Sequence, residues 1–168
     1  MIGSIFSGKQ YTIGDLMQID AARQNKSTGC KVVLEDIYHE VKKETLIDKL
    51  KSFLGMSTVA MYYITLKLSV ISTSGKTYTV YIQTPPDFSL VNWQSNKIKI
   101  YCSCPDFKYR SAYLLNSRKS LFLTPSLKSS LGRALTEAPK RDTTFLCKHA
   151  FAAVRWLAKN WSMIMKKV

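Results

Sequence analysis

Two short pairs of metal-ligand residues, far apart in the chain, constrain its fold more than any other feature of the sequence. Cys102 and Cys104 form a C-x-C pair, and Cys147 and His149 form a C-x-H pair after 42 intervening residues. Three thiolates and one imidazole are the usual donors of a structural zinc site. We therefore predict one structural Zn²⁺, which requires the fold to bring the two pairs together. Four protein ligands leave no position for a catalytic water, so we expect no chemistry at this ion.

The residues next to each pair predict a strand before the first and a helix after the second. The alternating run Lys97–Tyr101 leads directly into Cys102, and the period of two sends both sulfurs to the same side. The second pair begins a helix, whose N-terminal partial positive charge favours thiolate over thiol. The apolar stripe of this amphipathic helix is spaced at helical intervals: Val154, Leu157, Trp161, Ile164 and Val168.

In their order and flanking elements, the two pairs resemble the SWIM-type zinc finger over about residues 97–160. The resemblance implies that Cys102, Cys104, Cys147 and His149 are the zinc ligands, and the family is associated with DNA or protein contacts. The spacer is longer than usual for SWIM fingers, so we expect an insertion at residues 105–146. The sequences around each pair are also similar to small proteins of tailed bacteriophages. Cys30 and His39 remain, and we expect a free core cysteine and a surface histidine.

The overall pattern predicts an α+β fold. The first third is predicted to be helical: Thr12 caps one short helix, and apolar residues recur at helical spacing further on. A hairpin is predicted over Tyr62–Ile82, where apolar and polar residues alternate on both sides of Ser74-Gly75. We expect a helical region over residues 1–60 and a sheet with a zinc-binding module over residues 61–168, both within one compact unit. The apolar positions of the helical region are Ile13, Leu16, Ile19, Leu34, Ile37, Val41, Leu46, Leu50, Phe53 and Leu54.

The net charge of +14 is concentrated around the zinc motif. Residues 102–168 carry 13 basic and 3 acidic residues, whereas residues 1–101 carry 12 and 8. A field of this sign attracts nucleic acids, anionic membranes or acidic proteins; alternatively, it serves solubility alone. The residues predicted to meet an anionic partner lie on the insertion and on one stripe of the last helix: Lys108, Arg110, Arg118, Lys119, Lys148, Arg155, Lys159 and Lys166.

The insertion is predicted to be folded. Thr124 and Pro125 suit the N-cap and first position of a helix. Aromatic and basic residues interleave at Phe107-Lys108-Tyr109-Arg110, and two interpretations stay open. The run is either a surface that stacks bases and follows a nucleic-acid backbone, or a packing element around the zinc with solvated charges.

The sequence excludes several function classes. It contains no glycine-rich phosphate loop, no H-E-x-x-H and no nucleophile elbow, so we expect no enzyme and no small-molecule substrate. No apolar run is long enough to cross a bilayer, and Met1–Phe6 lacks the basic start of a signal peptide; we therefore expect an intracellular protein without a membrane partner. Two functions remain. We favour a structural bacteriophage virion component, assembled in the host cytoplasm through contacts with other protein subunits, over a DNA- or RNA-binding accessory protein.

Overall fold

The computed structural model describes residues 10–18, 27–41, 53–54, 62–85, 91–138 and 146–167. Its centre is a four-stranded antiparallel sheet in which the spatial order of the strands is their order in the chain. The predicted α+β class with a small antiparallel sheet is confirmed. The strands are β1 (Lys31–Val41), β2 (Tyr62–Ile71), β3 (Thr77–Thr84) and β4 (Lys99–Cys102).

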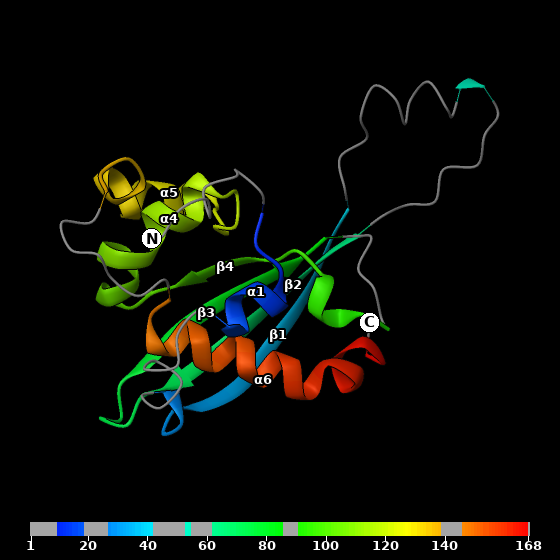
Figure 1. The fold of residues 1–168 in the computed structure, drawn as a ribbon, viewed down its shortest axis with the longest axis horizontal. Coiled ribbons are helices and arrows are strands. Elements are labelled where there is room, and N and C mark those ends of the chain that lie inside the picture. Colours follow the sequence, from blue (N-terminus) through cyan, green and yellow to red (C-terminus); the bar gives the residue numbers. More distant parts are fainter. Residues whose placement is uncertain are drawn as a thin grey trace.

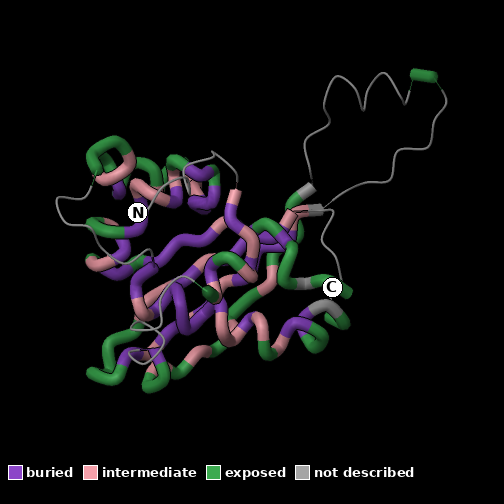
Figure 2. Tube along the Cα trace, in the orientation of Figure 1, coloured by how far each residue is buried: buried purple, intermediate pink, exposed green. Residues whose placement is uncertain are grey.

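Helix α6 (Lys148–Met165) covers one face of this sheet and contacts all four strands (Figure 1). The apolar stripe predicted for the helix lies in the core, where Val154, Leu157, Trp161 and Ile164 are buried. Figure 2 shows buried residues along both α6 and the strands beneath it. The helix and the sheet therefore share one core. Burying each such side chain stabilises the fold by about 1.5–3 kcal/mol. Val168 lies outside the described residues.

The predicted hairpin is formed by β2 and β3. Leu66 pairs with Ile82 and Leu68 with Val80, so these four side chains share the face that α6 covers. Gly75 lies in the connecting turn with φ +79°, a conformation that glycine adopts without strain.

Strand β1 corrects the predicted helical N-terminal third. Leu34 and Ile37 are three residues apart, which resembles helical spacing, but both belong to the strand. The pairing with β2 shifts between Leu34 and Asp36, so Glu35 is an extra residue, a β-bulge. The bulge lengthens the separation between successive residues that face α6 from two to three. This separation matches helical periodicity, which is why the sequence pattern of this strand predicted a helix. The predicted positions at residues 46 and 50 lie outside the described part, and Phe53 and Leu54 are exposed.

Helix α1 (Ile13–Gln18) confirms the first predicted helix. The Asp15 N–H donates to Thr12 Oγ1 at 3.1 Å, and the Thr12 N–H donates to Asp15 Oδ2 at 2.8 Å, which is a reciprocal cap. Ile13 and Leu16 are buried, and α1 packs against α6 and the short 3-10 helix η1 (Trp93–Ser95). The third predicted apolar position, residue 19, lies outside the described residues.

The described part of the insertion, residues 105–138, is folded, as predicted, and it covers the outer edge of β4. The Ile100 N–H donates to the Ser120 carbonyl at 2.9 Å, and the Phe122 N–H donates to the Ile100 carbonyl at 3.1 Å. Thr124 Oγ1 accepts from the Leu127 N–H at 3.2 Å, which confirms the predicted cap. The elements are η2 (Phe107–Ser111, a π-helical turn), α4 (Ala112–Ser117), α5 (Pro125–Leu131) and η3 (Gly132–Leu135).

Candidate metal centre

The first ligand pair is positioned by the end of β4. Cys102 pairs with Val80 on β3. The Ser103 N–H donates to the Thr79 carbonyl at 2.9 Å, and the Thr79 N–H donates to Ser103 Oγ at 3.0 Å, so the extended pairing continues past the last residue of the strand. Two residues along an extended chain point to the same side. Cys102 and Cys104 therefore present both sulfurs toward the α6 side of the sheet.

The second pair is positioned by the start of α6. Cys147 is the N-cap of the helix, and its Sγ accepts from the Ala150 N–H at 3.3 Å. Cys104 has the same relation to the next turn, because its Sγ accepts from the Phe107 N–H at 3.3 Å. A backbone N–H that donates to sulfur stabilises the thiolate form. Both sulfurs are thus held in place by the helical turns that they begin.

The fold brings the two pairs into one cluster. Each of Cys102, Cys104, Cys147 and His149 offers one ligand atom, and these atoms all lie within 4.8 Å of one another. Two sulfurs bound to one zinc lie at most about 4.6 Å apart, twice the Zn–S bond length. All four side chains are buried, with exposed fractions of 5% or less. The predicted ligands therefore form a compact, closed set at the junction of β4 and α6.

His149 gives an independent test of whether a cation fits this cluster. Neither ring nitrogen has a hydrogen-bond partner although both are buried, and the Tyr78 ring lies 4.3 Å from the imidazole, centroid to centroid. A buried polar group without a partner costs about 1–3 kcal/mol. A metal ion accepts an imidazole lone pair directly, so it removes part of this cost. The environment of His149 fits a ligand.

The protonation of the sulfurs also fits a cation. Hydrogen bonds from the Cys102 and Cys147 thiols hold the pKa of Cys104 far below its usual range. Burial raises the pKa of Cys102 and of Cys147. A divalent cation stabilises the thiolate form of all three sulfurs and so opposes the effect of burial on Cys102 and Cys147.

Two potential ligands lie outside the cluster. Cys30 is half-buried next to α6, and burial raises the pKa of its thiol while the charge of Lys148 partly offsets this. His39 is exposed on β1. Neither belongs to the metal-ligand cluster found among the described residues.

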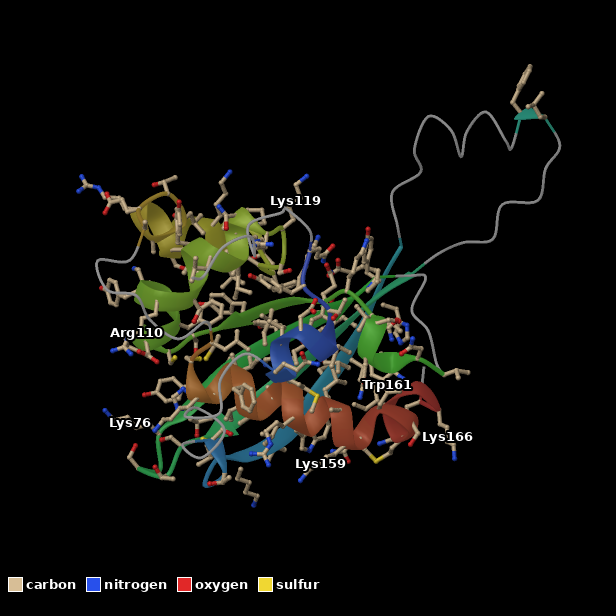
Figure 3. All side chains as sticks on the ribbon, in the orientation of Figure 1. Lys76, Arg110, Lys119, Lys159, Trp161 and Lys166 are labelled. Carbon is tan, nitrogen blue, oxygen red and sulfur yellow. The ribbon has the colours of Figure 1, made fainter. Side chains whose placement is uncertain are left out.

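The basic residues predicted to meet an anionic partner lie on α6 and on the insertion. Lys159 on α6 and Lys166 at its C-cap are exposed (Figure 3). Arg155 donates to Ser27 Oγ at 3.3 Å. On the insertion, Arg110 and Lys119 project from other sides of the molecule (Figure 3).

Two insertion cations are held by their neighbours, and a third is buried. Lys108 Nζ donates to the Ser130 carbonyl at 2.8 Å, and Arg110 pairs with Asp106 at 2.8 Å. Arg118 is only 7% exposed, and its guanidinium lies 5.2 Å from the centre of the Tyr11 ring. Arg118 was predicted as part of the anion-binding surface; the structure instead places it in the interior, where the aromatic ring offsets its burial.

Sequence reasoning missed two features near the cluster. The hydrogen bonds to sulfur were not predicted, although a cysteine directly before a helical turn is a signal for them. Arg133 was not predicted as a binding residue, because its place beside a hollow that Lys108 also lines depends on the bend between α5 and η3.

Comparison with known proteins agrees with the geometry. The family model of the SWIM zinc finger matches residues 78–114, from β3 through the C-x-C pair into α4. The match ends before Cys147, and the structure supplies the second pair from α6. No curated protein and no solved structure matches the chain, so the similarity to bacteriophage proteins stays a prediction. Residues 78–114 are thus similar to the SWIM zinc finger, and Cys102, Cys104, Cys147 and His149 are a site for one zinc ion.

Proposed function

We propose that this chain is a non-enzymatic, zinc-stabilised module that binds nucleic acid through the basic surface of α6. The observation that carries the proposal is a basic hollow between α6 and the turn before β1. Arg155 and Lys159 line it, together with the Trp156 ring and the hydroxyl residues Ser27 and Thr28. None of the described residues that line this hollow is acidic. Guanidinium, ammonium and hydroxyl groups around one concavity suit phosphate oxygens.

Charge and shape both support an extended anion. Lys159 and Lys166 are two turns apart on the exposed side of α6, so the basic surface continues beyond the hollow (Figure 3). The excess of 13 basic over 3 acidic residues in residues 102–168 adds a long-range attraction for a polyanion. Contacts of this kind position a phosphate backbone and carry little sequence information.

The zinc site supports a stabilising role instead of a catalytic one. Its four candidate ligands are all supplied by the protein and all are buried. Catalytic zinc keeps an open position for water or substrate. We propose that the ion fixes the start of α6 against β4 and thereby orients the basic surface of the helix.

Contacts with other protein subunits, including subunits of a virion, are the alternative. A basic helix also suits an acidic protein surface. No surface among the described residues identifies such a partner, whereas the hollow lined by Arg155 and Lys159 matches phosphate chemistry. We therefore place nucleic acid first.

In the described part of the chain, no helix is long and apolar enough to cross a bilayer.

The test is a salt series of binding to random-sequence duplex and single-stranded DNA. We expect a Kd of about 1 µM or tighter near physiological salt, at the strong end of nonspecific binding. Replacing Arg155 and Lys159 together with glutamine removes two phosphate contacts, so the slope of log K against log salt flattens by roughly 1.8 for duplex.

The matched control is the double variant Lys76→Gln with Lys128→Gln. It removes the same charge from two exposed positions outside α6, one in the turn between β2 and β3 and one on α5, and its slope should stay that of the unaltered chain. Equal slopes for the two double variants mean that net charge alone drives binding, and the assignment to α6 is then wrong. Absence of salt-dependent binding in the unaltered chain rejects the proposed function.

A further inference from the structure

The interleaved aromatic and basic run of the insertion is divided by the structure into an inner and an outer part. Phe107 is fully buried and meets the Tyr101 ring edge-on at 5.6 Å. Tyr109 is 68% exposed. Lys108 lies between them in sequence, with its Nζ 5.9 Å from the centre of the Tyr109 ring. The packing interpretation therefore holds for Phe107, whereas Tyr109 presents an aromatic ring and a neighbouring cation to the solvent.

Tyr109 lines a hollow between η2 and the corner where α5 meets η3. Its volume is about 710 Å³, within the range of ligand-binding clefts. Lys108 spans the two sides, because its Nζ donates to the Ser130 carbonyl on α5. Gly132 lies at the corner with φ +51°, a conformation that glycine adopts without strain. The hollow adjoins a second one that reaches Cys104 of the metal cluster.

The charges around this hollow favour an anion. Lys108 of η2 and Arg133 of η3 both line it, and Glu137 is the single acidic residue among the lining residues that the structure describes. A cation next to an exposed aromatic ring is the combination by which proteins hold single strands, since the ring stacks on a base while the cations meet phosphates. An acidic peptide would match the charges but would leave the exposed Tyr109 ring unused.

We propose that the hollow lined by Lys108, Tyr109 and Arg133 binds a short segment of single-stranded nucleic acid. One base stacks on the Tyr109 ring, and the flanking phosphates meet Lys108 and Arg133. The inference rests on the proposed function and deepens it, because it adds a preference for unpaired strands. Base pairs in a duplex are stacked on each other and offer no free base face to the ring, so the duplex gains only the electrostatic contacts.

The experiment measures binding of the zinc-loaded full chain to a labelled strand of roughly 12 nucleotides, within the span of one such site, and to the duplex of the same sequence. Tyr109→Ala should weaken single-strand binding about 10-fold, from the loss of one stacked base, and leave duplex binding unchanged. Tyr109→Phe keeps the ring and should retain the affinity. Arg133→Gln should flatten the single-strand salt slope by about 0.7, one contact.

The matched control is Tyr38→Ala, which removes another exposed tyrosine from β1, away from the insertion; it should change neither affinity. The inference is overturned if Tyr109→Ala leaves single-strand binding intact, or weakens strand and duplex equally. A further outcome also overturns the inference: an acidic peptide binds the chain and loses this binding in Tyr109→Ala, whereas strand binding persists. The hollow then binds a protein partner. If strand and duplex respond only to the α6 double variant, the inference fails and the proposed function stands. If neither binds, both fail.

Discussion

At the scale of single residues, Cys147 has two roles that the sequence shows only in part. As a ligand candidate it was evident from the C-x-H pair. As the N-cap of α6, with its sulfur accepting from the Ala150 N–H, it also satisfies a backbone donor that the helix cannot satisfy itself. The ligand role depends on residue type and spacing, which a sequence displays. The cap role depends on where the helix begins, which the structure settles.

Two substitutions at this residue separate the roles. We expect Cys147→Ala and Cys147→Ser both to abolish zinc binding, because neither supplies a thiolate. Serine is a good N-cap and alanine a poor one, so the metal-free serine variant should be more stable than the alanine variant by about 1 kcal/mol. Native mass spectrometry reads the zinc content, and denaturant unfolding with excess chelator reads the stability.

The control for this pair is Cys30→Ala, which alters a cysteine outside the cluster and should keep one zinc per chain. Retention of zinc by Cys147→Ala would show that this residue is not a ligand. Equal stability of the metal-free serine and alanine variants would remove the capping role.

At the scale of elements, the sequence correctly predicted the helices and strands whose periodicity is regular. The prediction failed where one extra residue in a strand changes the period. The β2–β3 hairpin and α6 have uninterrupted periods of two and of about 3.6 residues, and both were predicted correctly. Strand β1 was not, because the bulge at Glu35 changes the spacing of Leu34 and Ile37. Sequence periodicity cannot distinguish a bulged strand from a short helix, since the pairing that absorbs the extra residue lies in β2, more than 25 residues further along.

The bulge gives a prediction for β1. Deleting Glu35 restores simple alternation while keeping Leu34 and Ile37 on the face toward α6, so we expect a folded protein with a small loss of stability. Deleting Ile37 instead turns polar neighbours inward and should cost more than about 2 kcal/mol, as for the loss of a large core side chain. Thermal unfolding followed by circular dichroism compares the two deletions. A greater loss from the Glu35 deletion would mean that the bulge itself holds β1 in register.

At the scale of the whole molecule, the zinc site joins two layers that already share a core. Cys102 ends the last strand of the sheet and Cys104 follows two residues later, whereas Cys147 and His149 lie at the start of the helix that contacts all four strands. The sequence predicted the ligands and the flanking elements. It did not predict that α6 would pack over β1 and β2 as well, because that contact is set by sheet order and not by any local pattern. The proposed division of the chain at residue 60 stays a prediction, although β1 pairs with β2 across it.

Removal of zinc tests this arrangement. Because α6 buries its apolar stripe against every strand, we expect the chelated protein to unfold in one transition at a lower temperature, not to lose only its C-terminal half. Structural zinc contributes on the order of 10 kcal/mol in finger peptides; here Val154, Leu157 and Trp161 retain part of the packing, so the loss should be smaller. Calorimetry with chelator, and again after zinc is restored, measures the shift.

Hydrogen exchange locates the effect within the fold. The Phe107 N–H donates to Cys104 Sγ, and the Ala150 N–H donates to Cys147 Sγ. Without zinc, these two acceptor sulfurs are no longer held in place by a metal ion. The protection of the two amides should fall first, whereas amides of the central strand β2 exchange only when the whole domain unfolds. Two separate transitions would show that the zinc module and the sheet are independent units. An unchanged melting temperature after verified metal removal would show that the ion does not hold α6 on the sheet, and that apolar burial alone fixes the basic surface proposed to bind nucleic acid.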